Sequence, residues 1–302
     1  MLPFLPPFIP NLIQVAPFAI AFAFLFAAPL RRHAGAFYAF WTVAVVAVSW
    51  PDPVLLAMGN AAPASVVAYQ SYLDSLESSQ PLIGTVTTLL TSSFTGVCFY
   101  LIVMFSGALE KTPAVKKLLS VRSELSVIGG IVIMGHVVRV INFPLLFLSP
   151  MAQQVWGSAA SGAMFVASVI IGPLLTLVFL IPWITSFKVV RRRMSHATWK
   201  KTQVLAYPFM ALMIAQGFFL ALGHCLYGYP YDGATVTMAL MGNPVGWLGS
   251  FAQNVATAWM YLALGGAYLT LRLRKLHHAR GKEAHDGHES RRILGTSRNR
   301  RA

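Results

Sequence analysis

The chain has 302 residues, of which 56% are hydrophobic and only 11% are charged, and its mean hydropathy is +0.63. Soluble domains carry about 25% charged residues, so this composition excludes an ordinary soluble enzyme and indicates a polytopic membrane protein. The length leaves room for about six to eight spans of roughly 20 residues, but not for an additional soluble catalytic domain.

Seven apolar stretches predict membrane-spanning helices, and each stretch is ended by charged residues, Pro or Gly. In chain order they are residues 11–30, 34–50, 81–108, 125–148, 159–187, 202–227 and 244–271. The first stretch has Arg31 and Arg32 directly behind it and no basic residue ahead of it, which is the reverse of a secretory signal peptide. The predicted fold is an all-α polytopic membrane bundle of about seven transmembrane helices over residues 1–274.

Basic residues fall only in alternate connections, apart from Arg139, which lies inside a predicted span. The connections 51–80, 149–158 and 228–243 hold no Lys or Arg. Their acidic residues are Asp52, Asp74, Glu77 and Asp232. The positive-inside rule then predicts an external N-terminus and a cytoplasmic C-terminus. The net charge of +14 follows from this asymmetry and faces lipid headgroups, so no nucleic-acid partner is expected.

Residues 275–302 are rich in charge and lack a long apolar run, so we expect a disordered, basic cytoplasmic tail. Cys98 and Cys225 fall toward opposite membrane faces in this topology, which excludes a disulfide between them. The sequence contains no Walker loop, dinucleotide fingerprint or G-x-S-x-G motif. Any electron donor must therefore be a separate redox partner.

Arg139 follows His136 by three positions, so both side chains lie on one helical face. A charge at bilayer depth costs at least about 2.5–3.5 kcal/mol, which makes the pair a predicted functional site. Counted from Leu125, His136 lies roughly 17 Å and Arg139 roughly 21 Å into the membrane. Histidine could ligate haem iron while the arginine neutralises a haem propionate. A neutral histidine bonded to a neighbouring helix is the alternative, and both stay open.

Three segments resemble the ferric-reductase-like transmembrane family, which includes the haem-binding membrane subunit of bacterial methionine sulfoxide reductase systems. They are RSELSVIGGIVIMGH (122–136), TSFKVVRRRM (185–194) and TWKKTQVLAY (198–207). The resemblance covers a core of about residues 81–227. It implies a helical bundle in the bacterial inner membrane that holds b-type haem and passes electrons between a membrane or cytoplasmic donor and a partner reductase. Fold resemblance alone does not establish that chemistry.

His136 matches one haem-ligand position of this family. The resemblance places two further ligand positions on Gln203 and Gln216, where this chain has no imidazole. Met213 lies at about the depth of His136 and could complete a His/Met pair, with core-filling Met as the alternative. His224 is the only other histidine in an apolar span, but it lies roughly 12 Å beyond Gln216.

Three hypotheses follow from these residues. The first is an electron-transfer subunit whose haem b is held by His136 and an unidentified second ligand, or is five-coordinate. The second is a haem-free membrane anchor or quinone-contacting scaffold subunit of the same fold. If electrons move, the basic segment 188–201 and the tail are the expected docking face for their donor, with topology-setting charge near lipid as the alternative. The third is a small-molecule transporter, which ranks last because the chain has no inverted repeat and no acidic residue in a predicted span.

Overall fold

The structure is a computed structural model that describes residues 5–6, 8–141, 159–226 and 244–298. All regular elements within these residues are helices, which confirms the predicted all-α class. They are α1 (Asn11–Leu25), α2 (Ala27–Arg32), α3 (Ala34–Ser49), α4 (Pro51–Met58), the 3-10 turn η1 (Gly59–Ala61), α5 (Ala64–Ser79), α6 (Pro81–Thr91), α7 (Ser93–Ala108), α8 (Pro113–Leu119), α9 (Arg122–Arg139), α12 (Ala159–Ile184), α13 (Lys188–Arg191), α14 (His196–Gln203), α15 (Ala206–Leu226) and α17 (Pro244–Arg298).

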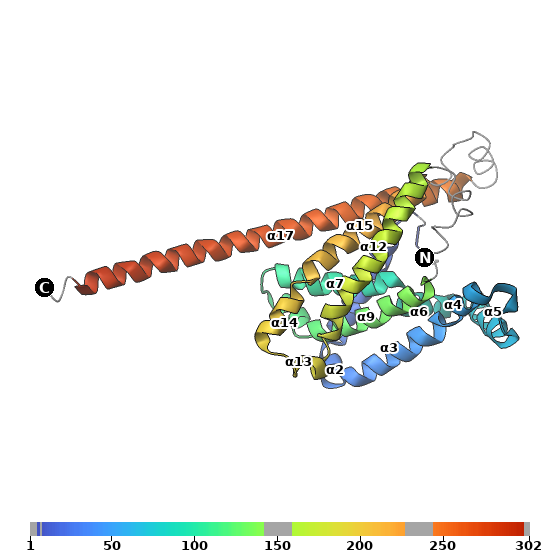
Figure 1. The fold of residues 1–302 in the computed structure, drawn as a ribbon, viewed down its shortest axis with the longest axis horizontal. Helices are drawn as coiled ribbons and strands as arrows, with labels where there is room; N and C mark the ends of the chain where they lie inside the picture. Colours follow the sequence, from blue (N-terminus) through green and yellow to red (C-terminus); the bar gives the residue numbers. More distant parts are fainter. Residues whose placement is uncertain (1–4, 7, 142–158, 227–243, 299–302) are drawn as a thin grey trace.

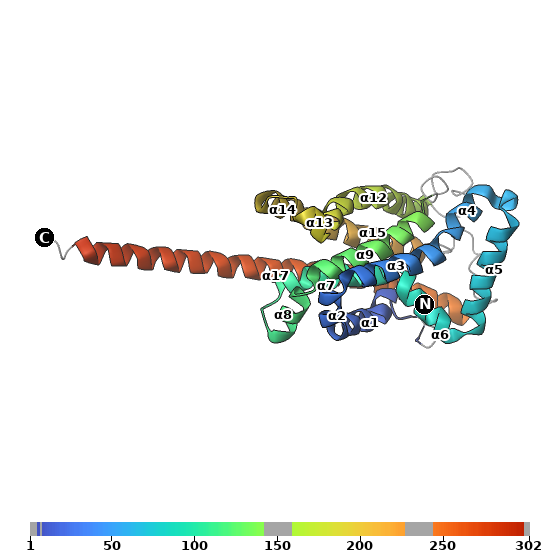
Figure 2. The ribbon, with the colours of Figure 1, turned by 90° about the horizontal axis from the view of Figure 1, so that it is seen from below.

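The longer helices run side by side, and the short ones gather at the two ends of the bundle (Figure 1). Helices α2, α8, α13 and α14 lie at one end, which we call the basic end because it carries Arg31, Arg32 and the Lys188–Lys201 segment (Figure 2). Helices α4, α5 and α6 lie at the opposite, acidic end, which carries Asp52, Asp74 and Glu77. The described connections therefore alternate between the two ends as the charge pattern predicts.

Three helical segments are long and apolar enough to cross a bilayer, namely Ala34–Ala61, Ala159–Ile184 and His196–Cys225. Two bent pairs, α6 with α7 and α8 with α9, raise the number to five if each pair is counted as one span. The chain is thus an α-helical membrane protein with three to five candidate spans among its described residues. The count of seven and the orientation of the termini stay predictions.

The predicted span 81–108 is broken at Ser92 into α6 and α7, which meet at a bend of 51°. Ser92 has an extended backbone, and its hydroxyl accepts a hydrogen bond from the N–H of Phe94. Serine is favoured at this N-cap position because its oxygen satisfies an N–H that the helix leaves unpaired. A second bend, of 57°, separates α8 from α9.

Helices α7 and α9 form the centre of the bundle and approach each other through glycine. A Cβ atom added at Gly96 would lie 2.8 Å from the carbonyl oxygen of Gly129. One side-chain hydrogen bond reinforces this packing, because Tyr100 Oη of α7 donates to the carbonyl of Ser126 in α9 at 2.7 Å. Trp183 Nε1 of α12 donates to the carbonyl of Val127 at 3.1 Å and so joins α12 to α9. The central helices are therefore packed too closely to leave a large cofactor space between α7 and α9.

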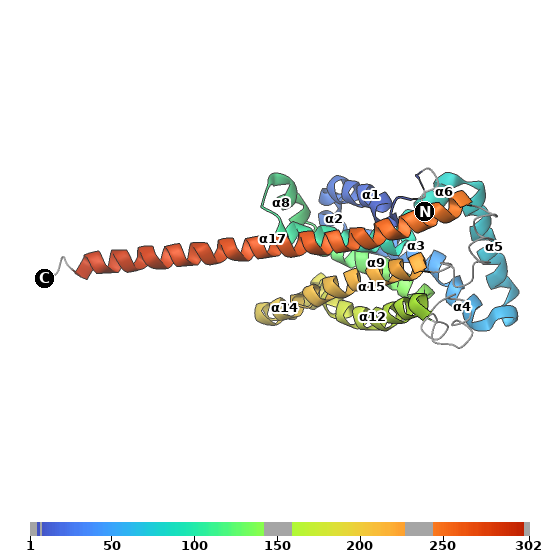
Figure 3. The same cartoon turned by 90° about the horizontal axis from the view of Figure 1, so that it is seen from above.

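Helix α17 extends well beyond the basic end as a single helix to Arg298 (Figure 3). The sequence predicts disorder from residue 275, so this is a difference between expectation and structure. The segment after Leu271 contains no proline and is rich in Leu, Arg, Lys, Ala and Glu, which all have high helix propensity. The predicted external connections 149–158 and 228–243, with Asp232, lie outside the described residues, as does the end of the stretch 125–148.

Candidate functional site

A polar cavity of about 860 Å³ opens at the acidic end. Its walls come from the ends of α3, α4, α5, α6, α7 and α9. The polar residues that line it are Asp52, Gln70, Asp74, Glu77, Thr88, Thr91, Ser92, Ser93, His136 and Arg139. The cavity therefore collects the predicted His136 and Arg139 together with acidic residues from the first connection.

Arg139 forms an ion pair with Asp52, and its Nε lies 2.5 Å from the carboxylate oxygen Oδ2. Arg139 is the last residue of α9 and lies at the acidic end of the bundle. Asp52 lies in the first turn of α4. An acidic side chain of the chain itself thus neutralises Arg139, in the place where a haem propionate was expected.

The turn of α9 that carries His136 is held against α3 through Gly135. A Cβ atom at Gly135 would collide with Val45 and lie 3.2 Å from the hydroxyl of Ser49. Only glycine permits this approach, because any larger side chain would push the two helices apart. The contact fixes the position from which His136 faces the cavity.

Helix α5 contributes the acidic wall of the cavity. Gln70, Asp74 and Glu77 are spaced by four and three residues, so they share one face of the helix. Gln70 Nε2 donates a 2.9 Å hydrogen bond to Asp74, while Gln70 Oε1 is buried without a hydrogen-bond partner. With three carboxylates against one guanidinium, the cavity favours cations and hydrogen-bond donors.

The two glutamines at the family's ligand positions face other helices. Gln203 Nε2 donates a 3.2 Å hydrogen bond to the hydroxyl of Thr185, close to the basic end. A Cβ atom added to Gly172 of α12 would lie 3.0 Å from Nε2 of Gln216, so the Gln216 side chain packs against α12. Neither glutamine lines the cavity that holds His136.

Met213 and His224 also lie apart from His136. Met213 is buried in a cluster with Tyr100, Phe179 and Phe209, which supports its reading as a core residue. His224 packs edge-on against Phe165 of α12, with ring centroids 5.0 Å apart. Helix α15, which carries both residues, packs mainly on α12 and α17, whereas α9 packs on α7 and α3.

The residues expected to hold haem b therefore do not converge. Ile133 and Met134 of α9 pack against the cluster that contains Met213, whereas His136 lines the polar cavity. No three His, Cys, Asp or Glu side chains in the described part of the chain come together as a possible metal site. A haem ligated by His136 and one of the four other candidates does not fit this arrangement.

A buried ion pair that the sequence does not predict lies at the basic end. Glu124 lies in the first turn of α9 with its side chain only 3% exposed, and Lys188 Nζ contacts its carboxylate at 2.9 Å. The Ser123 hydroxyl donates to the same carboxylate at 2.8 Å. Glu124 directly precedes the predicted span, which begins at residue 125, so its burial does not follow from the hydropathy pattern. The sequence signal for this ion pair is the position of Glu124, a single acidic residue at the border of an apolar run, together with the basic connection that contains Lys188.

Comparisons with known proteins place the chain in no family. No family model matches it, and no solved structure matches it. An uncharacterized protein of Treponema pallidum (strain Nichols) is 28% identical over 209 residues, which cover 65% of this chain. The matched region spans 56% of the length of that relative.

Proposed function

We propose that this chain is the membrane-embedded scaffold subunit of a redox assembly of the ferric-reductase-like type, and that it works without a haem ligated by His136. The separation of His136 from the other expected ligands carries this proposal. His136 faces the polar cavity, while Gln203 is bonded to Thr185 and Met213 is buried among aromatic rings. A helical bundle that resembles the ferric-reductase-like family but does not bring its haem-ligand positions together is suited to anchoring and binding a partner protein.

The basic end is the proposed docking surface for the redox partner. Lys275 Nζ donates to the carbonyl of Gly107 at 2.6 Å, and the guanidinium of Arg122 lies against the same glycine. Burial, together with the cations Arg272, Lys111 and Arg122, lowers the pKa of Lys275. Like charges crowded in this way attract an acidic surface and steer its approach.

In this proposal the basic end faces the cytoplasm of a bacterial inner membrane, as the positive-inside rule predicts. The polar cavity with His136 and Arg139 then opens on the opposite side. A soluble flavin-containing or haem-containing partner supplies the redox cofactor. The scaffold holds that partner at the bilayer surface, where lipid-soluble carriers such as quinone are within reach.

Affinity purification of the full chain from native membranes in a mild detergent tests the scaffold function. We expect a partner protein with bound flavin or haem to co-elute, read by fluorescence and absorption of the eluate. Reversing two exposed charges of α14, in Lys200→Glu/Lys201→Glu, should remove that partner. The control Glu77→Gln, at the acidic end, should retain it. An eluate without redox cofactor, or equal recovery with the charge-reversed variant, would contradict the proposal.

One observation favours a second function, the binding and transport of a small cationic solute. The break between α6 and α7 at Ser92 lines the polar cavity, and broken helices form the solute sites of many transporters. Asp74 and Glu77 would supply the charge for a cation. Thermal unfolding in the presence of spermidine tests this, because stabilisation that disappears in Asp74→Asn/Glu77→Gln supports it.

A further inference from the structure

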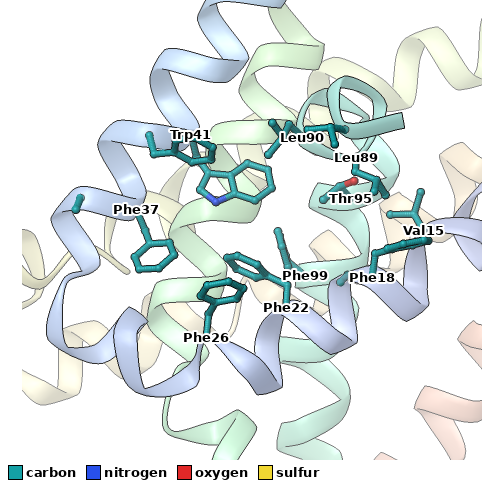
Figure 4. Close-up of a pocket in the computed structure, with 14 residues that line it drawn as sticks. Val15, Phe18, Phe22, Phe26, Phe37, Trp41, Leu89, Leu90, Thr95 and Phe99 are labelled. Atoms are coloured by element: carbon teal, nitrogen blue, oxygen red, sulfur yellow. The ribbon is translucent and has the colours of Figure 1, made fainter. Parts of the chain in front are cut away.

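A second, apolar cavity of about 750 Å³ lies between α1, α3, α6 and α7 (Figure 4). Thr95 is the only one of its lining residues that is not hydrophobic. The cavity shares no lining residue with the polar cavity around His136. It is therefore a separate cavity, and the family resemblance gives it no role.

Two residues that line this cavity each have a polar atom buried without a hydrogen-bond partner: Trp41 Nε1 and Thr95 Oγ1. Each residue is only 4% exposed. Native structures rarely leave buried donors and acceptors unpaired, because their lost hydration is then not compensated. Two such atoms on one cavity wall, contributed by α3 and α7, indicate that a ligand completes the site.

The indole ring of Trp41 is held firmly in place. The rings of Phe22 and Phe99 both stand edge-on to it, with centroids 5.8 Å away and interplanar angles of 81° and 82°. Figure 4 shows the indole directed into the space between the helices, with Phe22 and Phe99 below it and Thr95 on the α7 side. The indole ring is therefore held in place before any ligand enters, which lowers the entropic cost of binding.

The rim of the cavity lies on the lateral surface of the bundle. Phe40 is 57% exposed and Phe18 and Val86 are also exposed, whereas Trp41 and Phe99 behind them are buried. In a membrane-spanning bundle such an apolar rim faces hydrocarbon, so a ligand enters from the bilayer. None of the described residues that line the cavity is charged, which disfavours a charged head group in its interior.

We propose that this cavity binds a neutral, chain-bearing carbonyl compound dissolved in the bilayer. An indole N–H can only donate, so the ligand must supply an acceptor, and a carbonyl oxygen does so without charge. The hydroxyl of Thr95 donates to a second oxygen of the ligand. The aromatic walls hold the apolar body and tail. A lipid-soluble quinone and a neutral glycerolipid both carry this chemistry, and the experiment below distinguishes them.

Native mass spectrometry of the full, delipidated chain in detergent tests the proposal with two probes, decylubiquinone and dioleoylglycerol. We expect saturable one-to-one binding of at least one probe, and the probe that binds identifies the source of the ligand. Trp41→Phe and Thr95→Val each remove one hydrogen-bonding group and should weaken binding about fivefold, the usual effect of one hydrogen bond. Trp259→Phe, at an exposed position outside the cavity, should bind as the wild type does.

Thr95→Val also separates binding from folding. It replaces an unpaired buried hydroxyl with an isosteric methyl group, so the ligand-free protein should unfold at a higher temperature while its affinity falls. Absence of saturable binding for both probes would overturn the proposal. Equal affinity in the wild type and both cavity variants would also overturn the proposal, because that result would mean that the probe partitions into detergent and does not bind the cavity. The scaffold function is tested by co-elution of a partner and ligand binding by mass spectrometry, so either proposal can fail without the other.

Discussion

Arg139 at the end of α9 is paired with Asp52 in the first turn of α4. The pair joins the acidic end of a central helix to the connection that leaves α3. The pair also explains how an arginine can lie next to a long apolar sequence. Its charge is compensated by Asp52 of the same chain, so no bound cofactor is needed for this purpose. His136, one turn earlier, then belongs to the polar cavity that this pair borders.

Neutralising either partner should lower stability, and neutralising both should recover part of the loss. Arg139→Gln and Asp52→Asn each leave the opposite charge unpaired, while the double variant removes both charges. The side chains are 39% and 30% exposed, so we expect a coupling free energy of only about 1 kcal/mol. Equilibrium unfolding in mixed detergent micelles measures it. Asp74→Asn is the control, and additive effects of Arg139→Gln and Asp52→Asn would show that the pair is not coupled.

The ion pair of Glu124 and Lys188 should contribute more to stability than that of Arg139 and Asp52, because Glu124 is buried. Lys188→Met leaves the carboxylate without its cation and should cost about 2 kcal/mol, less than for a fully buried pair since the Lys188 side chain is 54% exposed. Glu124→Gln/Lys188→Met should restore most of that stability in the same unfolding assay. Lys200→Met, an exposed lysine on α14, is the matched control. If the double variant is no more stable than Lys188→Met, the ion pair is not the cause.

Gly96 tests the close packing of α7 on α9. Gly96→Ala places a methyl group 2.8 Å from the Gly129 carbonyl oxygen and should destabilise the protein by about 1–3 kcal/mol through overpacking. Gly266→Ala, where no atom lies within 4 Å, should leave stability unchanged or raise it through helix propensity. Thermal unfolding of both variants measures the difference. An unchanged midpoint for Gly96→Ala would mean that the two helices are further apart.

Cysteine labelling on intact cells tests the orientation of the two ends. In a background with Cys98→Ala and Cys225→Ala, Glu77→Cys should react with a membrane-impermeant thiol reagent added outside. Lys200→Cys should react only after the cells are permeabilised. Both positions are exposed, so access is decided by the side of the membrane. The reverse labelling pattern would place the basic end outside and contradict the positive-inside prediction.

Much of the fold could be predicted from hydropathy and charge. The stretch 34–50 matches α3 and the stretch 159–187 matches α12 closely, because long apolar runs bounded by polar residues mark buried or lipid-facing helices. The division of connections between a basic and an acidic end also follows from charge alone. Bends were not predictable in this way, since the cap at Ser92 interrupts α6 and α7 without changing their hydropathy.

The candidate site was predicted only in part. His136 and Arg139 stand out because they interrupt an apolar sequence. Asp52 did not, because its pairing joins residues 87 positions apart and depends on how α3 and α9 pack. The unpaired groups of Trp41 and Thr95 were equally hidden, since a buried donor without a partner is a property of packing rather than of sequence.

The absorption spectrum of the purified full chain, expressed with a haem precursor in the growth medium, tests the central claim most directly. The structure places His136 beside Arg139 and Asp52, apart from Met213 and His224, so we predict no Soret band that depends on His136. The wild type and His136→Ala should therefore give the same spectrum. A stoichiometric Soret band that is lost in His136→Ala and retained in His224→Ala would contradict the account.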